Sequence, residues 1–248
     1  MVYLRVLLVI PARYKSTRLP GKPLADLCGL PLVRHVWERC RQAVDSSDIL
    51  VATDDHRIAD VASGFGAQVE MTSPDCPTGT DRVAEVATRH VADWYLNVQG
   101  DEPFVQPSAI RLVKSTALSS RPEIAAINTM SVITNEPEFR SETVPKPVTG
   151  ASGRLLYMSR AGIPTDKQLR FRGAFRQVGL YAFRPSALAL YAPGAKKSQL
   201  ESIEDIELLR VVEAGLWVQM LEVPPSGIAV DTPEDLNNAR RLIRGDQS

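Results

Sequence analysis

The densest group of side chains that could do chemistry lies in residues 11–23, directly after the first apolar run of the chain. This segment reads Pro-Ala-Arg-Tyr-Lys-Ser-Thr-Arg-Leu-Pro-Gly-Lys-Pro and carries four cationic and two hydroxyl side chains. Such side chains suit a polyphosphate, because cations neutralise its charge and hydroxyls donate hydrogen bonds to its oxygens. The Walker A pattern GxxxxGK[ST] is absent, so side chains rather than a glycine-rich backbone would hold the phosphates. A solvated basic turn explains the same composition equally well.

Two acidic residues stand at the ends of apolar runs. Asp101 follows the predicted strand that ends at Val98, and Asp231 lies where a predicted strand at 228–230 passes into the last helix. Mg²⁺ takes one or two carboxylates and completes its coordination with phosphates and water. Taken alone, each acid has a structural explanation, and Asp231 could belong to a helix cap. Two such acids beside a cationic loop nevertheless indicate metal-nucleotide chemistry.

Two further turns follow predicted strands. Residues 52–55, Ala-Thr-Asp-Asp, are explained by the N-cap of a helix, where a short polar side chain accepts a backbone hydrogen bond. Residues 78–82, Thr-Gly-Thr-Asp-Arg, enter another helix, whose N-terminus could receive an anionic group of a ligand. Capping would account for Thr80 but not for Arg82. The second turn is therefore a candidate part of a ligand site.

The composition argues against several classes of function. The chain of 248 residues has 29 basic and 29 acidic side chains, whereas a surface that binds nucleic acid or an anionic membrane needs a net basic face. The three cysteines lack CxxC spacing, so neither a disulfide framework nor a zinc site is indicated. No Ser-His-Asp or Cys-His arrangement is recognisable. The apolar run that ends at Ile10 is too short to span a membrane, and we expect a cytoplasmic protein.

Alternating strands and helices must position these residues. Residues 5–10 form a nearly continuous Val/Leu/Ile run, which is typical of a strand buried on both faces of a parallel sheet. This alternation indicates a Rossmann-like sheet, in which ligands bind at the carboxyl ends of the strands. The cationic loop and Asp101 would both lie there. The further strands are predicted at 48–53, near 69 and at 94–98, with helices at 31–43, 55–63 and 81–89.

The middle of the chain departs from this alternation. Residues 134–176 are interpreted as an insertion without a clear helix, between long predicted strands at 124–133 and 177–183. Pro145 and Pro147 lack the amide hydrogen that a sheet requires, so their segment must be an edge strand or irregular. The chain is predicted to be one domain, 1–248. Its last elements are a helix at 203–214, a strand at 217–223 and a helix at 233–243.

These motifs closely resemble those of the CMP-Kdo synthetases, the 3-deoxy-manno-octulosonate (Kdo) cytidylyltransferases. Residues 11–24 match the nucleotide-binding signature of that family, and the resemblance continues nearly end to end. The resemblance implies an α/β fold with a Rossmann-like, doubly wound mixed sheet of the nucleotidyltransferase type and an inserted β-rich dimerisation and acceptor segment at about residues 134–184. The other matching segments are Val51–Asp55, Gly79–Arg82, Asn97–Pro103, Tyr157–Arg160, Gly179–Tyr181 and Val230–Leu236.

The resemblance also implies an activity, the Mg²⁺-dependent transfer of CMP from CTP to the hydroxyl of an acidic sugar with release of pyrophosphate. In-line attack at the α-phosphorus needs no protein nucleophile, so catalysis would come from positioning and electrostatic stabilisation. By analogy with the family, Arg13 and Lys22 would neutralise the triphosphate, and Asp101 and Asp231 would hold Mg²⁺. The other nucleotide-binding positions are Pro11, Ala12, Ser16, Thr17, Arg18, Thr78 and Gly79, and the acceptor-binding positions are Arg82, Gln99, Arg160, Tyr181 and Glu207.

Two positions on the acceptor side depart from the family's pattern. Gln177 stands where most relatives have His, and Leu208 stands where they usually have Gln. Kdo is the expected acceptor, and its 8-amino analogue or a small phosphonate is the alternative. A non-catalytic CTP-binding module is an alternative of another class, but the joint presence of the phosphate-binding cations and both metal-binding acids favours an enzyme. A nucleotidyltransferase for another base would usually have a glycine-rich loop, which this chain lacks.

The family resemblance also implies an assembly and a pathway. A homodimer would form through the insertion, and the long apolar strands at 125–133 and 178–183 are compatible with this. The product would serve lipopolysaccharide biosynthesis.

Overall fold

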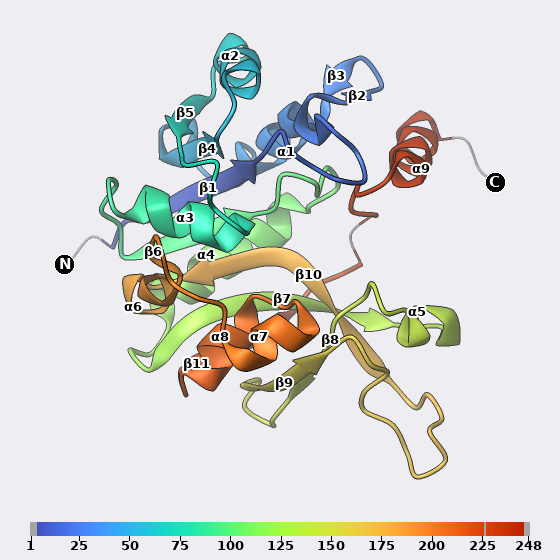
Figure 1. Ribbon diagram of the computed structural model, residues 1–248. Helices are drawn as coiled ribbons and strands as arrows, with labels where there is room; N and C mark the ends of the chain where they lie inside the picture. Colours follow the sequence, from blue (N-terminus) through green and yellow to red (C-terminus); the bar gives the residue numbers. More distant parts are fainter. Residues whose placement is uncertain (1–3, 226, 246–248) are drawn as a thin grey trace.

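A mixed seven-stranded sheet forms the centre of the computed structural model, which describes residues 4–225 and 227–245 (Figure 1). The strand order is β11-β7-β10-β6-β1-β4-β5. β10 is antiparallel to both of its neighbours, whereas the other six strands are mutually parallel. The α/β class and the mixed sheet predicted from the sequence are therefore confirmed.

The elements have the following bounds. The strands are β1 Val6–Ala12, β2 Asp26–Leu27, β3 Leu30–Pro31, β4 Ile49–Thr53, β5 Gln68–Met71, β6 Trp94–Val98, β7 Ile124–Ile133, β8 Lys146–Thr149, β9 Leu155–Ser159, β10 Ala174–Phe183 and β11 Trp217–Glu222. The helices are α1 Leu32–Cys40, α2 His56–Gly64, α3 Gly79–Ala87, α4 Pro107–Ser119, α5 Glu136–Arg140, α6 Pro185–Leu188, α7 Gln199–Glu204, α8 Leu208–Glu213 and α9 Pro233–Arg244.

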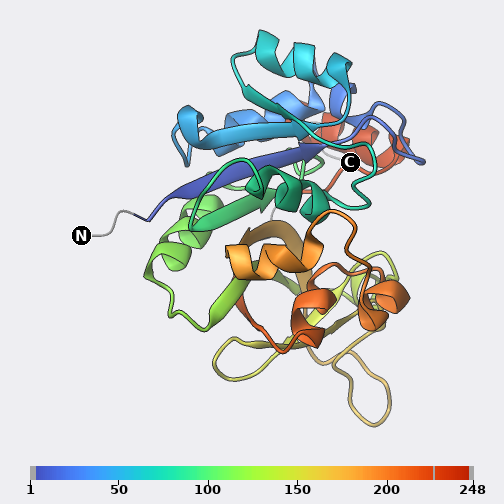
Figure 2. The same cartoon turned by 60° about the vertical axis from the view of Figure 1, so that its left-hand side comes forward.

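Helices cover both faces of the sheet, which is why every residue of β1 is buried. Leu8 and Ile10 face one core together with side chains of α1 and α4. Leu7 and Val9 face the opposite core together with side chains of α3 and α8. The layers are visible in Figures 1 and 2. Alternate residues of a strand point to opposite faces, so a continuous apolar run is what a strand between two helix layers requires. None of the helices in the described residues is long and apolar enough to cross a membrane.

The insertion between β7 and β10 contains the hairpin β8–β9 and the short helix α5 (Figure 1). The prediction that it has no helix was wrong, because Asn135 caps α5 by accepting a hydrogen bond from the backbone N–H of Glu138. The edge-strand prediction for the segment of Pro145 and Pro147 is confirmed, since β8 pairs only with β9 within its two-stranded sheet. Its Lys146 is fully buried, and the ammonium donates to the carbonyls of residues 141, 144 and 160.

The predicted helix at 203–214 is wrong, because two helices occupy this region. α7 ends at Glu204, α8 begins at Leu208, and Asp205 between them has a left-handed backbone with φ of 50°. The guanidinium of Arg160 holds this break by donating to the carbonyls of Glu204 and Asp205. The regular apolar spacing of 203–214 thus predicted helix where a tertiary contact interrupts it.

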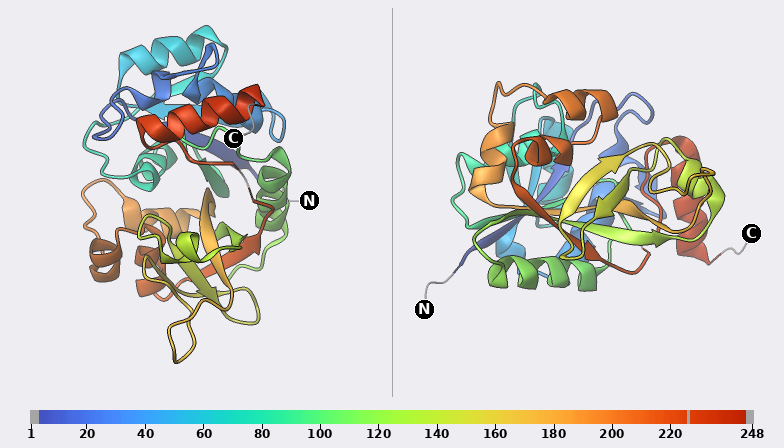
Figure 3. Two further views of the ribbon diagram at one scale, coloured as in Figure 1. Left: turned by 90° about the vertical axis from the view of Figure 1, so that its right-hand side faces the viewer. Right: turned by 90° about the horizontal axis from the view of Figure 1, so that it is seen from below.

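Helix α9, near the end of the chain, lies beside β2 and β3 (Figures 1 and 3). Leu236 and Ala239 of α9 pack against Leu27 and Leu32, next to β2 and β3. The helix predicted at 233–243 is confirmed, and Thr232 caps it by accepting a hydrogen bond from the N–H of Asp235. The strand predicted just before Asp231 is not formed. Helices α4 and α6 were not predicted, although Ile110, Val113 and Ala117 of α4 recur at helical spacing.

Candidate active site

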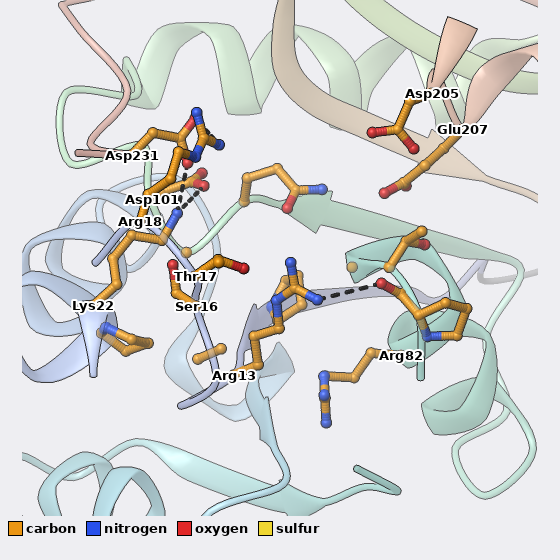
Figure 4. A pocket seen from close by; sticks show the side chains of 18 of the residues that line it. Arg13, Ser16, Thr17, Arg18, Lys22, Arg82, Asp101, Asp205, Glu207 and Asp231 are labelled. Atoms are coloured by element: carbon orange, nitrogen blue, oxygen red, sulfur yellow. Dashed lines mark hydrogen bonds and ion pairs between the residues drawn. The ribbon is translucent and has the colours of Figure 1, made fainter. Parts of the chain in front are cut away.

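A cavity of about 340 Å³ lies where the carboxyl ends of β1 and β6 meet (Figure 4). Its walls come from the cationic loop after β1, the start of α3, the turn after β6, the break between α7 and α8, and the segment before α9. All but two of the predicted site residues line it, and the exceptions are Arg160 and Tyr181. The predicted residues that line it are Pro11, Ala12, Arg13, Ser16, Thr17, Arg18, Lys22, Thr78, Gly79, Arg82, Gln99, Asp101, Glu207 and Asp231.

One lysine joins the two acids that the sequence places far apart. Lys22 Nζ lies 2.7 Å from Asp101 Oδ2 and 3.0 Å from Asp231 Oδ1 (Figure 4). A backbone hydrogen bond from Val230 N to Asp101 O, 2.9 Å long, holds the two segments side by side. Arg18 adds a second ion pair to Asp231 at 3.1 Å. Two carboxylates and two cations therefore meet at one end of the cavity.

These ion pairs fix the charges at that end. Burial alone would lower the pKa of Lys22, but the charges of Asp101 and Asp231 outweigh it and raise the pKa above 10.5. Burial alone would raise the pKa of Asp231, but Lys22 and Arg18 hold it below 3.8. At neutral pH Lys22 is thus protonated and Asp231 is ionised.

Close backbone packing shapes the floor of the cavity at two glycines. A Cβ on Gly100 would lie 2.6 Å from the carbonyl oxygen of Pro11, and a Cβ on Gly79 would lie 2.8 Å from Gln99 Oε1. Only glycine permits the approach to backbone at residue 100, whereas a Cβ at residue 79 would displace the end of the Gln99 side chain. The loops after β1 and β6 and the start of α3 are consequently held in contact, and Gln99 is placed between them.

The start of α3 is capped by Thr78, whose hydroxyl accepts a hydrogen bond from Asp81 N at 3.2 Å. The proposed capping role of Thr80 was therefore wrong, and the helix begins two residues before the predicted start. Arg13 reaches this turn from the cationic loop and donates to Pro77 O at 3.3 Å (Figure 4). The cationic loop and the helix N-terminus thus face the same space.

The other end of the cavity carries Asp205 and Glu207 (Figure 4). The break between α7 and α8 brings both side chains there. Burial raises the pKa of Glu207 above 4.5. Its Oε2 is buried and has no hydrogen-bond partner among the described residues. A buried oxygen without a partner is costly unless a ligand or water supplies one, so this end suits a hydroxyl-bearing ligand.

Arg82 lines the cavity but its guanidinium is already engaged. The side chain is 2% exposed, contacts Asp54 Oδ1 at 3.6 Å, and donates to the hydroxyl of Thr72 and to Ser73 O. Arg160 lies behind the wall, where its guanidinium donates to three backbone carbonyls, those of Glu142, Glu204 and Asp205. Its position supports the wall rather than forming it.

Tyr181 is buried on β10, and its hydroxyl accepts a hydrogen bond from Gln177 Nε2 at 3.3 Å. Gln177 also donates to Asn128 Oδ1. Neither Gln177 nor Leu208 lines the cavity. Leu208 is fully buried in the core beneath α8. The two departures from the family's pattern therefore lie outside the cavity wall.

Lys197 and Asp205 were not predicted as site residues, but both line the cavity and form an ion pair. Their place depends on the break in the predicted helix, which no local pattern indicated. Pro23, Pro77 and Gly100 line the cavity as well, and each adjoins a residue that was predicted.

Glu204 provides a measurable check on how the insertion is attached to α7. It accepts hydrogen bonds from Arg160 N at 2.9 Å and Ser159 Oγ at 2.6 Å. Burial would raise its pKa, but these bonds hold it below 4.5. The ionised form therefore contributes stability that is present above about pH 4.5 and is lost as the pH falls through the lowered pKa. Glu204→Gln cannot ionise.

We expect the thermal midpoint of the unchanged protein to fall more steeply between about pH 5 and pH 3 than that of Glu204→Gln. Thermal unfolding followed by circular dichroism over this range measures the difference. Glu123→Gln, at an exposed turn before β7, is the matched control and should follow the unchanged protein. Parallel curves for Glu204→Gln and Glu123→Gln would contradict the role given to Glu204.

Comparisons with known proteins agree with one another. The family model described as Cytidylyltransferase matches residues 7–221. The 3-deoxy-manno-octulosonate cytidylyltransferase of Syntrophotalea carbinolica is 43% identical over 246 residues, covering 96% of this chain and 98% of that protein. The corresponding protein of Vibrio vulnificus is 44% identical over 248 residues, covering 95% and 96%. The solved structure of CMP:2-keto-3-deoxy-manno-octonic acid synthetase complexed with CTP is 35% identical with a TM-score of 0.89, covering 98% of this chain and 100% of that chain.

Proposed function

Since this chain belongs to the 3-deoxy-manno-octulosonate cytidylyltransferase family, we propose that its cavity binds CTP and transfers CMP to Kdo with release of pyrophosphate. The observation that carries the proposal is the meeting of Lys22 with Asp101 and Asp231 at one end of the same cavity that presents Glu207 at the other. The first end suits a triphosphate with its counter-charges, and the second suits the hydroxyls of a sugar.

The nucleotide end stabilises charge on the phosphates. The acceptor hydroxyl loses its proton to water and attacks the α-phosphorus, a new oxygen–phosphorus bond forms, and the bond to the β-phosphate breaks as pyrophosphate leaves. Negative charge shifts toward the leaving group during this step, so fixed cations near the phosphates lower the barrier. Arg13, Arg18 and Lys22 are the cations of the loop after β1 that line the cavity. Ser16 and Thr17 can donate hydrogen bonds to the same oxygens.

We further propose that Asp101 and Asp231 hold Mg²⁺. Their oxygens Oδ2 and Oδ1 lie within 3.0 Å of one point, the Lys22 ammonium, so they converge as the ligands of one cation must. Carboxylate oxygens are the donors that Mg²⁺ prefers, and two of them leave room for phosphate and water. No cluster of three His, Cys, Asp or Glu ligands occurs in residues 4–225 and 227–245, which fits a metal bound jointly with substrate. When bound, Mg²⁺ supplies neutralisation of phosphate charge and lowers the pKa of the attacking hydroxyl.

Kdo is the acceptor that the cavity wall supports. Glu207 offers a buried oxygen that has no hydrogen-bond partner within residues 4–225 and 227–245, and Gln99 offers an amide between the two ends of the cavity. Gln177 and Leu208, whose identities raised the alternative acceptors, lie outside the wall. Their change therefore need not alter which acid fits.

The test is pyrophosphate release with CTP and Mg²⁺ across a panel of acceptors, namely Kdo, its 8-amino analogue, a sialic acid and small phosphonates. We expect the highest kcat/KM with Kdo. Turnover with another acid and none with Kdo would contradict the acceptor while leaving cytidylyl transfer intact. No turnover with any acceptor would contradict the function itself.

The assembly and the setting are proposals of the same kind. Exposed apolar side chains on and beside the insertion, Leu156 at 56% and Leu169 at 66%, support a homodimer formed through residues 134–184. Sedimentation at micromolar concentration tests it. The equal numbers of acidic and basic side chains support the absence of a nucleic-acid partner. Family membership supports a cytoplasmic enzyme of lipopolysaccharide biosynthesis.

A further inference from the structure

The acceptor in the proposed function is an acid, so the sugar end of the cavity must offset a carboxylate. That end already carries the acidic side chains Asp205 and Glu207 (Figure 4). Like charges repel strongly where water is partly excluded. A cation with capacity for a new partner is therefore required there.

The arginines near this end are committed to the protein. The guanidinium of Arg82 is 2% exposed and contacts Asp54, Thr72 and Ser73. The guanidinium of Arg160 donates to three backbone carbonyls behind the wall. Releasing Arg82 would leave a buried acceptor unsatisfied, which is unfavourable, and releasing Arg160 would remove the contacts that hold the break between α7 and α8.

Lys197 is placed and held differently. It lines the cavity, and its Nζ lies 2.7 Å from Asp205 Oδ1, with side chains that are 35% and 74% exposed respectively. An ion pair so open to solvent adds little stability, so exchanging its partner costs little. The hydrogen bond to Asp205 raises the pKa of Lys197 above 10.5, so the side chain is charged at neutral pH.

The two partners differ in how their backbones are held. Asp205 is fixed by its left-handed backbone at the end of α7 and by the bond from Arg160 to its carbonyl. Lys197 belongs to the exposed segment 192–197 before α7, which turns at Gly194 with φ of +85°. A lysine carries its charge on a flexible four-carbon stem. The lysine can therefore change partner while the aspartate stays in the wall.

We propose that Lys197 binds the carboxylate of the sugar-acid acceptor, exchanging its ion pair with Asp205 for one with the substrate. This assignment rests on the proposed function and adds a residue that selects acids over uncharged sugars. Arg18 and Lys22 remain with the phosphates of CTP at the opposite end, and Arg13 stays at the turn before α3. Lys197 thus acts on the acceptor alone.

The experiment compares Lys197→Gln with Lys196→Gln by steady-state pyrophosphate release. Glutamine keeps most of the length of lysine and removes the charge. We expect the KM for Kdo to rise about tenfold in Lys197→Gln, which corresponds to about 1.4 kcal/mol, and the KM for CTP to change less than about twofold. Lys196 is exposed and does not line the cavity, so Lys196→Gln should match the unchanged protein in both constants.

A second measurement isolates the carboxylate. The unchanged protein is assayed with Kdo and with its carboxamide, and the ratio of the two kcat/KM values is the preference for the acid. This ratio should fall about tenfold in Lys197→Gln and stay constant in Lys196→Gln. A role confined to folding would lower both values together and leave the ratio unchanged.

The outcomes separate the two claims. If the unchanged protein turns over Kdo but Lys197→Gln keeps its KM and its preference for the acid, the assignment of Lys197 is overturned and the proposed function stands. A rise in the KM for CTP alone would also overturn it, because Lys197 would then serve the phosphates. If the unchanged protein does not turn over Kdo, the proposed function fails and the assignment fails with it.

Discussion

Replacing Asp101 by asparagine is expected to lower the rate of pyrophosphate release by about 10³-fold, equivalent to about 4 kcal/mol in the barrier. Asparagine has the same shape, but it lacks the negative charge that Lys22 contacts at 2.7 Å and that Mg²⁺ would need. Single-turnover assays at saturating CTP and Mg²⁺ measure the chemical step, because they separate it from product release.

The fold of this variant should be retained, since Asp101 lies on a turn and its side chain is 25% exposed. Circular dichroism and the thermal midpoint check this point. Asp60→Asn, on the exposed side of α2, is the matched control and should keep the full rate. If Asp101→Asn turns over within tenfold of the rate of the unchanged protein, the proposal that Asp101 holds Mg²⁺ is contradicted.

The largest expected effect on stability comes from Arg210→Met. The side chains of Arg210 and Glu201 are 5% and 1% exposed, and Nη2 of the arginine lies 2.8 Å from Oε1 of the glutamate. The same guanidinium donates to Leu190 O at 3.0 Å and lies over the ring of Tyr191. Removing one partner of a buried pair leaves an uncompensated charge, and we expect the free energy of unfolding to fall by about 3–5 kcal/mol.

Equilibrium unfolding in urea measures this loss. The double variant Glu201→Gln with Arg210→Met should lose less than the sum of the two single variants, because the orphaned charge is removed together with its partner. Arg241→Met on the exposed face of α9 is the control, with an expected change within about 0.5 kcal/mol. If the free energy of unfolding of Arg210→Met falls by less than about 1 kcal/mol, the ion pair between Glu201 of α7 and Arg210 of α8 does not stabilise the fold as expected.

The convergence of residues 11–23 with Asp101 could be predicted from the sequence because both follow the ends of strands. β1 and β6 are short apolar runs between turn signals, and in a parallel sheet their carboxyl ends meet at one edge. Residues 11–23 and Asp101 therefore had to converge. Asp231 lies in the same cavity, as predicted, although no strand forms before it. A hydrogen bond from Val230 N to Asp101 O holds that segment instead.

The sugar end could not be predicted in the same way. Ile206 and Leu209 continue the apolar spacing of a helix across 203–214, so local pattern favoured one helix. A tertiary contact from Arg160, distant in the sequence, stabilises the break at Asp205 instead. Asp205 reaches the cavity through that break, and Lys197 pairs with it from the segment before α7, so the spacing of the sequence did not indicate either residue. The sequence likewise gives no sign that Lys146 is buried, where its ammonium donates to three backbone carbonyls.

The closure of the chain upon itself sets an order of maturation. Lys22 meets Asp231 across most of the sequence, and α9 packs on residues near β2 and β3. Contacts of such sequence separation form late, because loop closure must precede them. During synthesis the cationic loop is made early, whereas Asp231, the second acid that contacts Lys22, is added only when nearly all of the chain has been made. A product that ends after β11 would contain every strand of the central sheet and still lack Asp231, one of the two acids proposed to hold Mg²⁺, so we expect it to be inactive.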